Sequence, residues 1–428
     1  MTLAVQTQPR LLRAPARTMP TWPVTVPLVT YPVWWASGIG ELALVPFAVC
    51  AAMLLLRNPA TRVPRGIGPW LIMVMWVVAS LLQIDTGGRL VGAIYRLVLY
   101  AAITVFIVYV FNAWSPRNQQ RICGAIAVFL LWMTLGATAG LLYPLWELRT
   151  PLIYVVPHGL LGNDIVHQMV VRRLTEYNPL AWNADVMSPR PSFPFLYTNG
   201  WGSSYSLMLP FVLLYVSQEK NRLRTAAVIL LVVASTVPAA LTLNRGMVLG
   251  LAVGLLYFMA RGVATGRKGW LVGAAVFAAF GTALLMILPI QQRLEARNAT
   301  TGSTATRLSL YQEAWDRTLA SPILGYGAPR PSIHTGAPSV GTQGQLWATL
   351  FSHGILAAVA LVVWLAVVAV VSLRKADALH TATGAVGVMA LTEVLYYGMI
   401  PFPFLWVAIA AALVFAAQQR PDLALSRP

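Results

Sequence analysis

The sequence predicts an all-α membrane protein with about twelve transmembrane helices and two long outward-facing loops that carry short helices. Hydrophobic residues make up 58% of the 428 residues and charged residues only 10%. This composition, with a mean hydropathy of +0.68, is too apolar for a soluble domain of this size. Apolar runs of roughly 17–25 residues recur along the chain, which is the length of a helix that crosses a bilayer. Lipid offers no partner to backbone polar groups, so these runs should be helices rather than the short alternating strands of a barrel.

The predicted spans divide the chain into a single polytopic membrane domain, residues 22–417, between basic cytoplasmic tails at 1–21 and 418–428. They are residues 22–37, 40–56, 68–84, 91–112, 122–143, 203–217, 225–243, 246–260, 270–290, 346–372, 379–397 and 401–417. With the N-terminus inside, most Lys and Arg residues fall in short inner loops, as the positive-inside rule expects. The net charge of +17 therefore reflects topology and does not indicate nucleic-acid binding.

Two long polar loops, about 144–202 and 291–345, then face the outside and hold most of the groups suited to chemistry. No zinc-ligand spacing, Walker loop or nucleophile elbow occurs in the sequence, so we expect neither a bound metal nor a cofactor. Cys50 and Cys123 lie in or beside predicted spans and do not suggest a disulfide framework. A membrane protein of this kind is expected to handle a polar substrate at its outer face.

Arg245 is the first unusual outward-side arginine. It closes the apolar run before it and is followed at once by GMVLGLAVGLLYF, which predicts a tight hairpin of two spans with a guanidinium at its tip. An ionisable group at the membrane is costly and is a functional candidate by default. The alternative is an interfacial arginine that reaches the lipid headgroups.

Arg307 lies in a segment that predicts a short amphipathic helix on the outer surface. Its apolar residues recur at helical spacing: Leu308, Tyr311, Ala314, Trp315 and Leu319. Thr304 or Thr306 could cap the helix, which would put Arg307 in its first turn. The helix dipole disfavours a cation there and favours an anion, so this arginine fits a bound phosphate better than a solvated surface position.

Arg190 is the third unusual outward-side arginine, and it lies in the segment PRPSFPFLYTNGWG. Pro191 and Pro194 predict a rigid extended lip, and Tyr197 and Asn199 supply hydrogen-bonding groups before the next span. Three guanidiniums on one membrane face suggest an oligophosphate ligand, because arginine forks match phosphate oxygens in pairs. Two further arginines, Arg172 and Arg173, are predicted to lie on a solvated face.

These motifs resemble the O-antigen ligase and O-antigen polymerase superfamily of polytopic glycosyltransferases, most strongly over residues 187–357. Similar proteins carry an arginine followed by a Gly/Phe-rich stretch and an asparagine, here Arg190 to Asn199. They carry a span that ends in a turn like LTLNRG, here with Arg245. They also carry an arginine and aromatic helix before a Pro-x-x-Gly-x-Gly motif, here Arg307, Tyr311, Trp315, Pro322, Gly325 and Gly327.

The resemblance implies a donor glycan linked through diphosphate to a polyprenyl carrier, and a glycan or glycolipid acceptor. Transfer to an acceptor hydroxyl would invert the configuration of the anomeric carbon and would need no metal. The enzyme would lie in the lipid bilayer of a bacterial plasma membrane and act at its outer face. The three arginines would hold the diphosphate and stabilise the leaving group. Tyr197, Asn199, Tyr311 and Trp315 would contact the substrate, and the spans would form a groove for the lipid tail.

One departure concerns the acceptor base. Members of the family carry a histidine about eleven residues before a glycine that opens a span, and here that position is Gln343. A glutamine cannot accept a proton in catalysis, although it could orient the acceptor. The candidates for the base are His334 in RPSIHTG, Glu313 and Asp316, with His353 better explained as a satisfied core histidine. A lost active site is a further alternative.

Two other functions compete with transfer. A flippase for lipid-linked oligosaccharides would place charges along a central path within its spans. Here the only ionisable residues near span centres are Glu41, Arg96 and Glu393, and a structural Arg96–Glu393 pair would account for two of them. A peptidoglycan polymerase of the shape, elongation, division and sporulation family would need an outward catalytic aspartate in its own motif, which this sequence does not contain.

Overall fold

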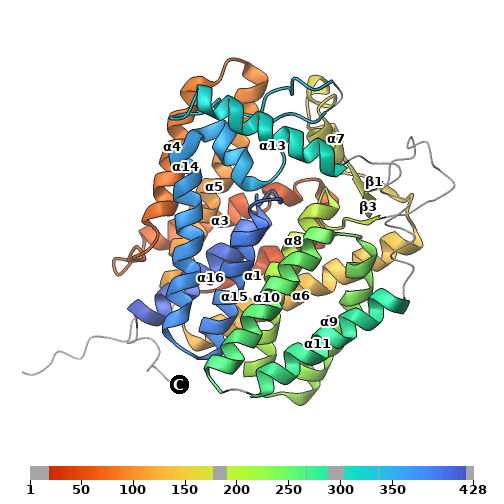
Figure 1. Cartoon of the computed structure of the whole chain (residues 1–428), viewed down its shortest axis with the longest axis vertical. Helices are drawn as coiled ribbons and strands as arrows, with labels where there is room; N and C mark the ends of the chain where they lie inside the picture. Colours follow the sequence, from red (N-terminus) through yellow and green to blue (C-terminus); the bar gives the residue numbers. More distant parts are fainter. Residues whose placement is uncertain (1–18, 177–189, 267, 288–302, 336, 421–428) are drawn as a thin grey trace, which may run out of the picture.

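A computed structural model describes residues 19–176, 190–266, 268–287, 303–335 and 337–420. Most of these residues are helical. Long helices form a bundle, and a layer of short elements with one amphipathic helix lies across one end of it (Figure 1). The first half of the bundle contains α1 (Trp22–Val29), α2 (Tyr31–Ser37), η1 (Gly40–Leu42), α3 (Leu44–Leu56), α4 (Gly68–Ser80), η2 (Leu81–Gln83), α5 (Gly87–Ala113) and α6 (Pro116–Leu142).

The first long loop contains small strands and short helices in place of a long span. Its elements are β1 (Glu147–Arg149), η3 (Pro151–Tyr154), η4 (His158–Leu160), α7 (Asp164–Val170), β2 (Val171–Arg173), β3 (Thr175–Glu176) and β4 (Arg190–Pro191). Antiparallel pairing sets Glu147 opposite Arg173 in one sheet and Glu176 opposite Arg190 in the other. These two-stranded sheets therefore place acid–arginine pairs side by side.

The second half of the chain completes the bundle and supplies the helix that crosses its end. It contains α8 (Thr198–Gln218), α9 (Arg222–Leu241), α10 (Arg245–Ala264), α11 (Lys268–Ile287), α13 (Ser303–Ala320), α14 (Gln345–Val371), η5 (Ser372–Arg374), α15 (Ala378–Glu393) and α16 (Phe402–Gln419). The predicted amphipathic helix is thus confirmed as α13, which lies across the end of the bundle and packs on α14 (Figure 1).

The predicted number of twelve spans is not confirmed. Within the described residues, six helices are long and apolar enough to cross a membrane, namely α5, α6, α9, α10, α14 with η5, and α16, so the chain is a multi-pass membrane protein. α3 and α4 have 13 residues each, about 20 Å of helix against a hydrocarbon layer of roughly 30 Å. The range 22–37 is broken at Thr30, because Pro32 has no N–H to continue the helix.

The basic loops collect at the end of the bundle away from α13. The N-terminal end of α5 lies beside Asp85, which pairs with Arg330 of the second long loop. At the other end of α5, Asn112 accepts a hydrogen bond from the Arg62 backbone N–H at 2.9 Å. Other basic residues there bond to neighbouring segments, including Arg65 with Gln419 and Arg374 with Gln418. This arrangement matches the charge asymmetry read from the sequence.

α16 is the central helix of the bundle. In its most apolar window 89% of the residues are buried, so it has almost no lipid-facing side. Phe402 stacks on Phe129 of α6 with ring centroids 5.3 Å apart, and Phe404 meets Trp70 of α4 at the same separation. Aromatic contacts of this kind add to the area that the core buries.

Two predicted placements of charged residues are wrong. Glu393 does not pair with Arg96: its carboxylate accepts hydrogen bonds from Ser203 at 2.7 Å and from Ser206, both on α8. α15 packs closely on the small-residue face of α8, which brings those hydroxyls within reach. Arg172 is not solvated either, because it is 1% exposed and forms a two-point ion pair with Glu41. A buried arginine is tolerated only with such a partner.

A methyl group at Gly250 is expected to destabilise the bundle. An added Cβ there would overlap the buried Glu393 carboxylate, whereas one at Gly92 of α5 would meet open space. Gly250→Ala should lower the free energy of unfolding by about 1–3 kcal/mol, the usual cost of overpacking. Gly92→Ala should leave it unchanged or raise it by about 1 kcal/mol. Thermal unfolding of both variants in detergent measures the difference, and equal midpoints would contradict the packing described here.

Candidate functional site

A polar cavity of about 310 Å³ lies at the end of the bundle that α13 crosses. Five separate segments contribute to its wall: β4, the start of α8, the turn between α9 and α10, α13, and the segment after α15. The lining residues are Arg190, Asn199, Leu243, Asn244, Arg245, Gly246, Arg307, Leu308, Tyr311, Tyr396 and Tyr397. All three arginines singled out from the sequence line this one cavity, which we call the arginine cavity.

Arg190 is positioned by the small sheet of β3 and β4. Its Nε donates to the Thr242 carbonyl oxygen at 2.8 Å, and its Nη1 lies 3.8 Å from Oε2 of Glu176, its cross-strand neighbour. Burial lowers the pKa of the Arg190 guanidinium, and the Glu176 carboxylate acts in the opposite direction. The positive charge of Arg307 also acts to lower this pKa, so the two cations of the cavity repel each other.

Arg245 begins α10 directly after the α9–α10 turn, as the predicted hairpin requires. Leu243 adopts a left-handed conformation with φ 53° although it is not a glycine, and such backbone strain often occurs at functional sites. The turn is fixed from both sides by Asn244. Its Nδ2 donates to the Thr198 carbonyl oxygen at 3.1 Å, and its Oδ1 accepts from the Tyr397 hydroxyl.

Arg307 and Tyr311 reach the cavity from α13. Leu310 and Ala314 of this helix pack in a small apolar cluster with Val340 and with Phe351 of α14. Tyr311 stacks on Trp347 of α14 with ring centroids 4.7 Å apart. These contacts hold the helix across the bundle end, so that Arg307 faces the hairpin of α9 and α10.

Glu313 ties α13 to the loop that follows it. Its carboxylate accepts hydrogen bonds from the Ser332 hydroxyl at 2.6 Å and from the Ile333 backbone N–H at 3.1 Å, and it pairs with Arg317. Although burial acts to raise it, these hydrogen bonds lower the pKa of Glu313. Glu313 is therefore committed to a structural contact.

Two details predicted for α13 differ in the structure. The helix begins at Ser303, so Arg307 lies just beyond its first turn, and the proposed caps fall inside the helix. The predicted apolar stripe is only partly buried: Tyr311 and Ala314 pack against α14, whereas Leu308, Trp315 and Leu319 are exposed.

The charges that line the arginine cavity have one sign. No carboxylate is among the described residues of its wall, which contains three guanidiniums from three segments. The first backbone N–H groups of α10, at Arg245 and Gly246, add a partial positive charge. A ligand with several negative charges would offset the repulsion between the cations and use their paired N–H donors.

Only some of the other predicted residues join the cavity. Asn199 and Tyr311 line it, whereas Tyr197 is 42% exposed and belongs to a neighbouring cavity. Trp315 and His334 are exposed outside the wall of the arginine cavity. Gln343 lies two residues before α14, next to its N-cap Gly344, and is not among the described lining residues either.

His353 has the structural role expected for it. The ring is buried and its Nδ1 lies 2.6 Å from the Ser80 hydroxyl of α4, which satisfies it within the bundle. Asp316 is an exposed residue of α13. Among the described residues, no group of three His, Cys, Asp or Glu is arranged to hold a metal ion.

Sequence reasoning missed Asn244, Tyr396 and Tyr397. Asn244 directly precedes Arg245, so its position next to a predicted site residue could have identified it. The two tyrosines lie about 150 residues farther along the chain, and their hydroxyls reach the hairpin through tertiary packing: Tyr396 donates to the Gly246 carbonyl oxygen at 3.0 Å. No local pattern indicates such a contact.

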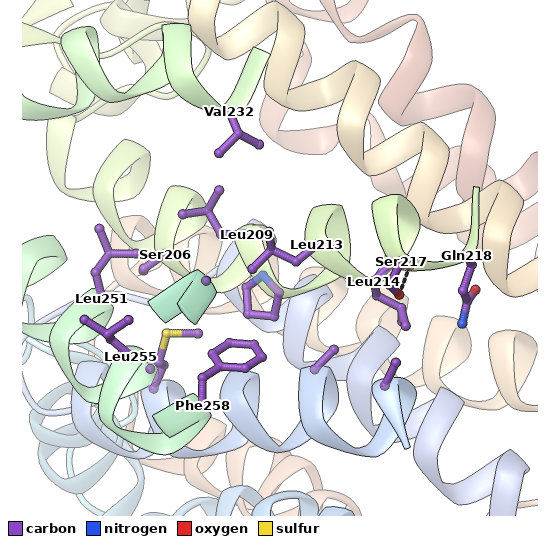
Figure 2. A pocket seen from close by; sticks show the side chains of 16 residues that line it. Ser206, Leu209, Leu213, Leu214, Ser217, Gln218, Val232, Leu251, Leu255 and Phe258 are labelled. Carbon is purple, nitrogen blue, oxygen red and sulfur yellow. Dashed lines mark hydrogen bonds between the residues drawn. The ribbon is translucent and has the colours of Figure 1, made fainter. Parts of the chain in front are cut away.

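A second, apolar cavity of about 550 Å³ lies deeper in the bundle, between α8, α9, α10, α11 and α15. Figure 2 shows Leu209 and Leu213 of α8 facing this space with Leu251, Leu255 and Phe258 of α10. Its wall includes Ser206, which donates to Glu393. Gly250, one turn of α10 beyond Gly246, lies against that carboxylate.

The comparison with known families bears on this site. Residues 230–362 match a family model described as O-antigen ligase. The matched segment contains Arg245, Arg307 and Tyr311, and it ends before Tyr396 and Tyr397; Arg190 lies before it. No curated protein matches the chain closely enough to count as a relative.

The arginine cavity should bind inorganic diphosphate. Because a ligand that binds only the folded state stabilises it, diphosphate at ten times its dissociation constant should add about 1.4 kcal/mol to the free energy of unfolding. Arg307→Ala should abolish this stabilisation. Arg89→Gln, which changes an arginine paired with Asp85 and not lining the cavity, should retain it. The measurement is thermal unfolding of the wild type, Arg307→Ala and Arg89→Gln with and without diphosphate. Equal stabilisation of all three proteins would mean that the anion binds outside the arginine cavity.

Proposed function

We propose that this chain, whose residues 230–362 match an O-antigen ligase family model, belongs to the O-antigen ligase and polymerase superfamily and is a membrane glycosyltransferase. It moves a glycan from a polyprenyl-diphosphate carrier to an acceptor hydroxyl at the outer face of a bacterial plasma membrane. The observation that carries the proposal is the convergence of Arg190, Arg245 and Arg307 on one cavity.

The diphosphate of the donor occupies the arginine cavity. Each guanidinium offers a planar fork of N–H donors, and the three come from segments with independent anchors, so together they can hold two phosphoryl groups. The cavity lies where α8 and α10 begin, at the end of the bundle. A carrier bound there keeps its isoprenoid chain in the hydrocarbon layer while its glycan stays in water.

Transfer is a single displacement. The acceptor oxygen forms a bond to the anomeric carbon as the bond from that carbon to the phosphate oxygen breaks, and the electron pair leaves with the polyprenyl diphosphate. The attack comes from the face opposite the leaving group, so the configuration inverts. Negative charge develops on the diphosphate, and prepositioned arginines stabilise it most at that moment.

The charge distribution supports the proposed orientation. Basic segments around Arg62, Arg261 and Arg374 lie at the end of the bundle away from α13, and the positive-inside rule assigns that end to the cytoplasm. The arginine cavity then faces the outside, where carrier-linked glycans are consumed. The basic tails proposed at 1–21 and 418–428 lie mostly outside the described residues.

Arg245→Ala and Arg307→Ala should each abolish transfer, since each removes a diphosphate contact without removing core packing. The measurement uses purified protein in detergent, an extract of polyprenyl-diphosphate-linked glycans, and the release of free polyprenyl diphosphate. Loss of one oxyanion-type donor typically slows a reaction about 100- to 1,000-fold. Arg89→Gln serves as the control and should react at the wild-type rate.

Two results would argue against this assignment. Normal release by either alanine variant would remove the diphosphate role from that arginine. Binding of the carrier lipid by the wild type without any cleavage, under every acceptor fraction tried, would favour a flippase instead of a transferase.

A further inference from the structure

A third cavity, of about 370 Å³, adjoins the arginine cavity on the outer side. Its wall is mostly polar and comes from α7, β2, β3, β4 and the segment that leads into α8. Arg190 lines both cavities and so forms part of the wall between them. The residues used below are Gln168, Glu176, Ser192 and Tyr197.

We propose that this outer polar cavity binds the acceptor carbohydrate and that Glu176 is the base that takes the proton of the acceptor hydroxyl. The inference rests on the transferase function proposed above and deepens it. Gln168, Ser192 and Tyr197 present an amide and two hydroxyls, groups that both donate and accept hydrogen bonds, as sugar hydroxyls do. Gln168 Nε2 donates to the Tyr197 hydroxyl at 3.0 Å, so the two side chains already form one polar surface.

Glu176 is the only carboxylate among the described residues that line either cavity. Its Oε2 accepts a hydrogen bond from the Thr198 backbone N–H at 3.0 Å and lies 3.8 Å from Nη1 of Arg190. Both contacts use the same oxygen, and among the described residues Oε1 accepts no hydrogen bond. The side chain is 43% exposed and lines the outer cavity, so we infer that this second oxygen can accept a proton from a hydroxyl bound there.

The position of Glu176 matches the geometry of a displacement. Its cross-strand neighbour Arg190 borders the proposed diphosphate on one side, while Glu176 lines the proposed acceptor cavity on the other. An acceptor bound in the outer cavity would have Glu176 beside it and would meet the donor at Arg190, which both cavities share. His334 is exposed on the second long loop and lines neither cavity, and Gln343 cannot accept a proton.

The proton and electron balance is complete without another reactant. The Glu176 carboxylate takes the hydroxyl proton as the acceptor oxygen bonds to the anomeric carbon of the donor. At the same time the bond between that carbon and the bridging oxygen of the diphosphate breaks. The electron pair of that bond leaves on the diphosphate. The neutral Glu176 then returns its proton to water or to the departing diphosphate, which restores the carboxylate.

Glu176→Gln tests the base, with Glu147→Gln as the matched control. Glu147 is also an exposed strand carboxylate opposite an arginine, 2.5 Å from Arg173, but it lines neither cavity. Release of polyprenyl diphosphate at saturating glycan should fall about 100-fold or more in Glu176→Gln and stay at the wild-type rate in Glu147→Gln. Stabilisation by inorganic diphosphate should persist in both variants.

Three outcomes would overturn the role of Glu176. Turnover could persist in Glu176→Gln. Diphosphate stabilisation could disappear together with turnover, which would make Glu176 only the counter-ion of Arg190. Turnover could instead disappear in His334→Ala, which would move the base to the second loop. A wild type that releases no polyprenyl diphosphate would refute the transferase function itself, a result distinct from these.

The acceptor cavity has a separate binding test that does not depend on turnover. The probe is the free glycan released from the carrier lipids by mild acid, with binding to the full-length protein followed by saturation-transfer difference NMR. Gln168→Ala should weaken binding about tenfold, the cost of losing well-placed hydrogen bonds. Gln312→Ala, an exposed glutamine of α13, should bind as the wild type does. Equal affinities for the two variants would remove the carbohydrate from this cavity.

Discussion

The arginine cavity depends on the anchoring of one short turn, Thr242–Asn244, at the tip of the α9–α10 hairpin. The Thr242 carbonyl oxygen holds Arg190, and Asn244 bonds both to the start of α8 and to Tyr397. Segments far apart in the chain are thereby fixed around Arg245. Preorganised charge of this kind needs no rearrangement during the reaction, which is where its catalytic value would lie.

The part of the candidate site that could be predicted from the sequence is its arginines, because charged side chains are unfavourable beside a membrane. Arg190, Arg245 and Arg307 are conspicuous because cations close to apolar spans are costly, and all three line the same cavity. Glu176 was not predictable, since β3 has only two residues and no period to read. The pairing of Arg172 with Glu41 was equally hidden, because 131 residues separate the partners.

The fold was predictable at the level of helices and less so at the level of spans. Composition and apolar runs indicate helices in the right places, since lipid leaves the backbone no alternative. Whether a helix crosses the membrane depends on where it ends, and prolines near the N-terminus shorten the first ones. α13 has a similar limit. The sequence predicts the helix, but which of its faces is buried depends on the helix that it packs against.

The position of Arg190 in the wall of both polar cavities has a consequence for binding. One guanidinium cannot be oriented independently toward two ligands, so occupation of either cavity changes the affinity of the other, and thermodynamic linkage makes the two effects equal. An anion that binds Arg190 relaxes its attraction for Glu176. On the proposed function, donor and acceptor would therefore bind as a coupled pair, and each ligand would report through Arg190 on whether the other is present.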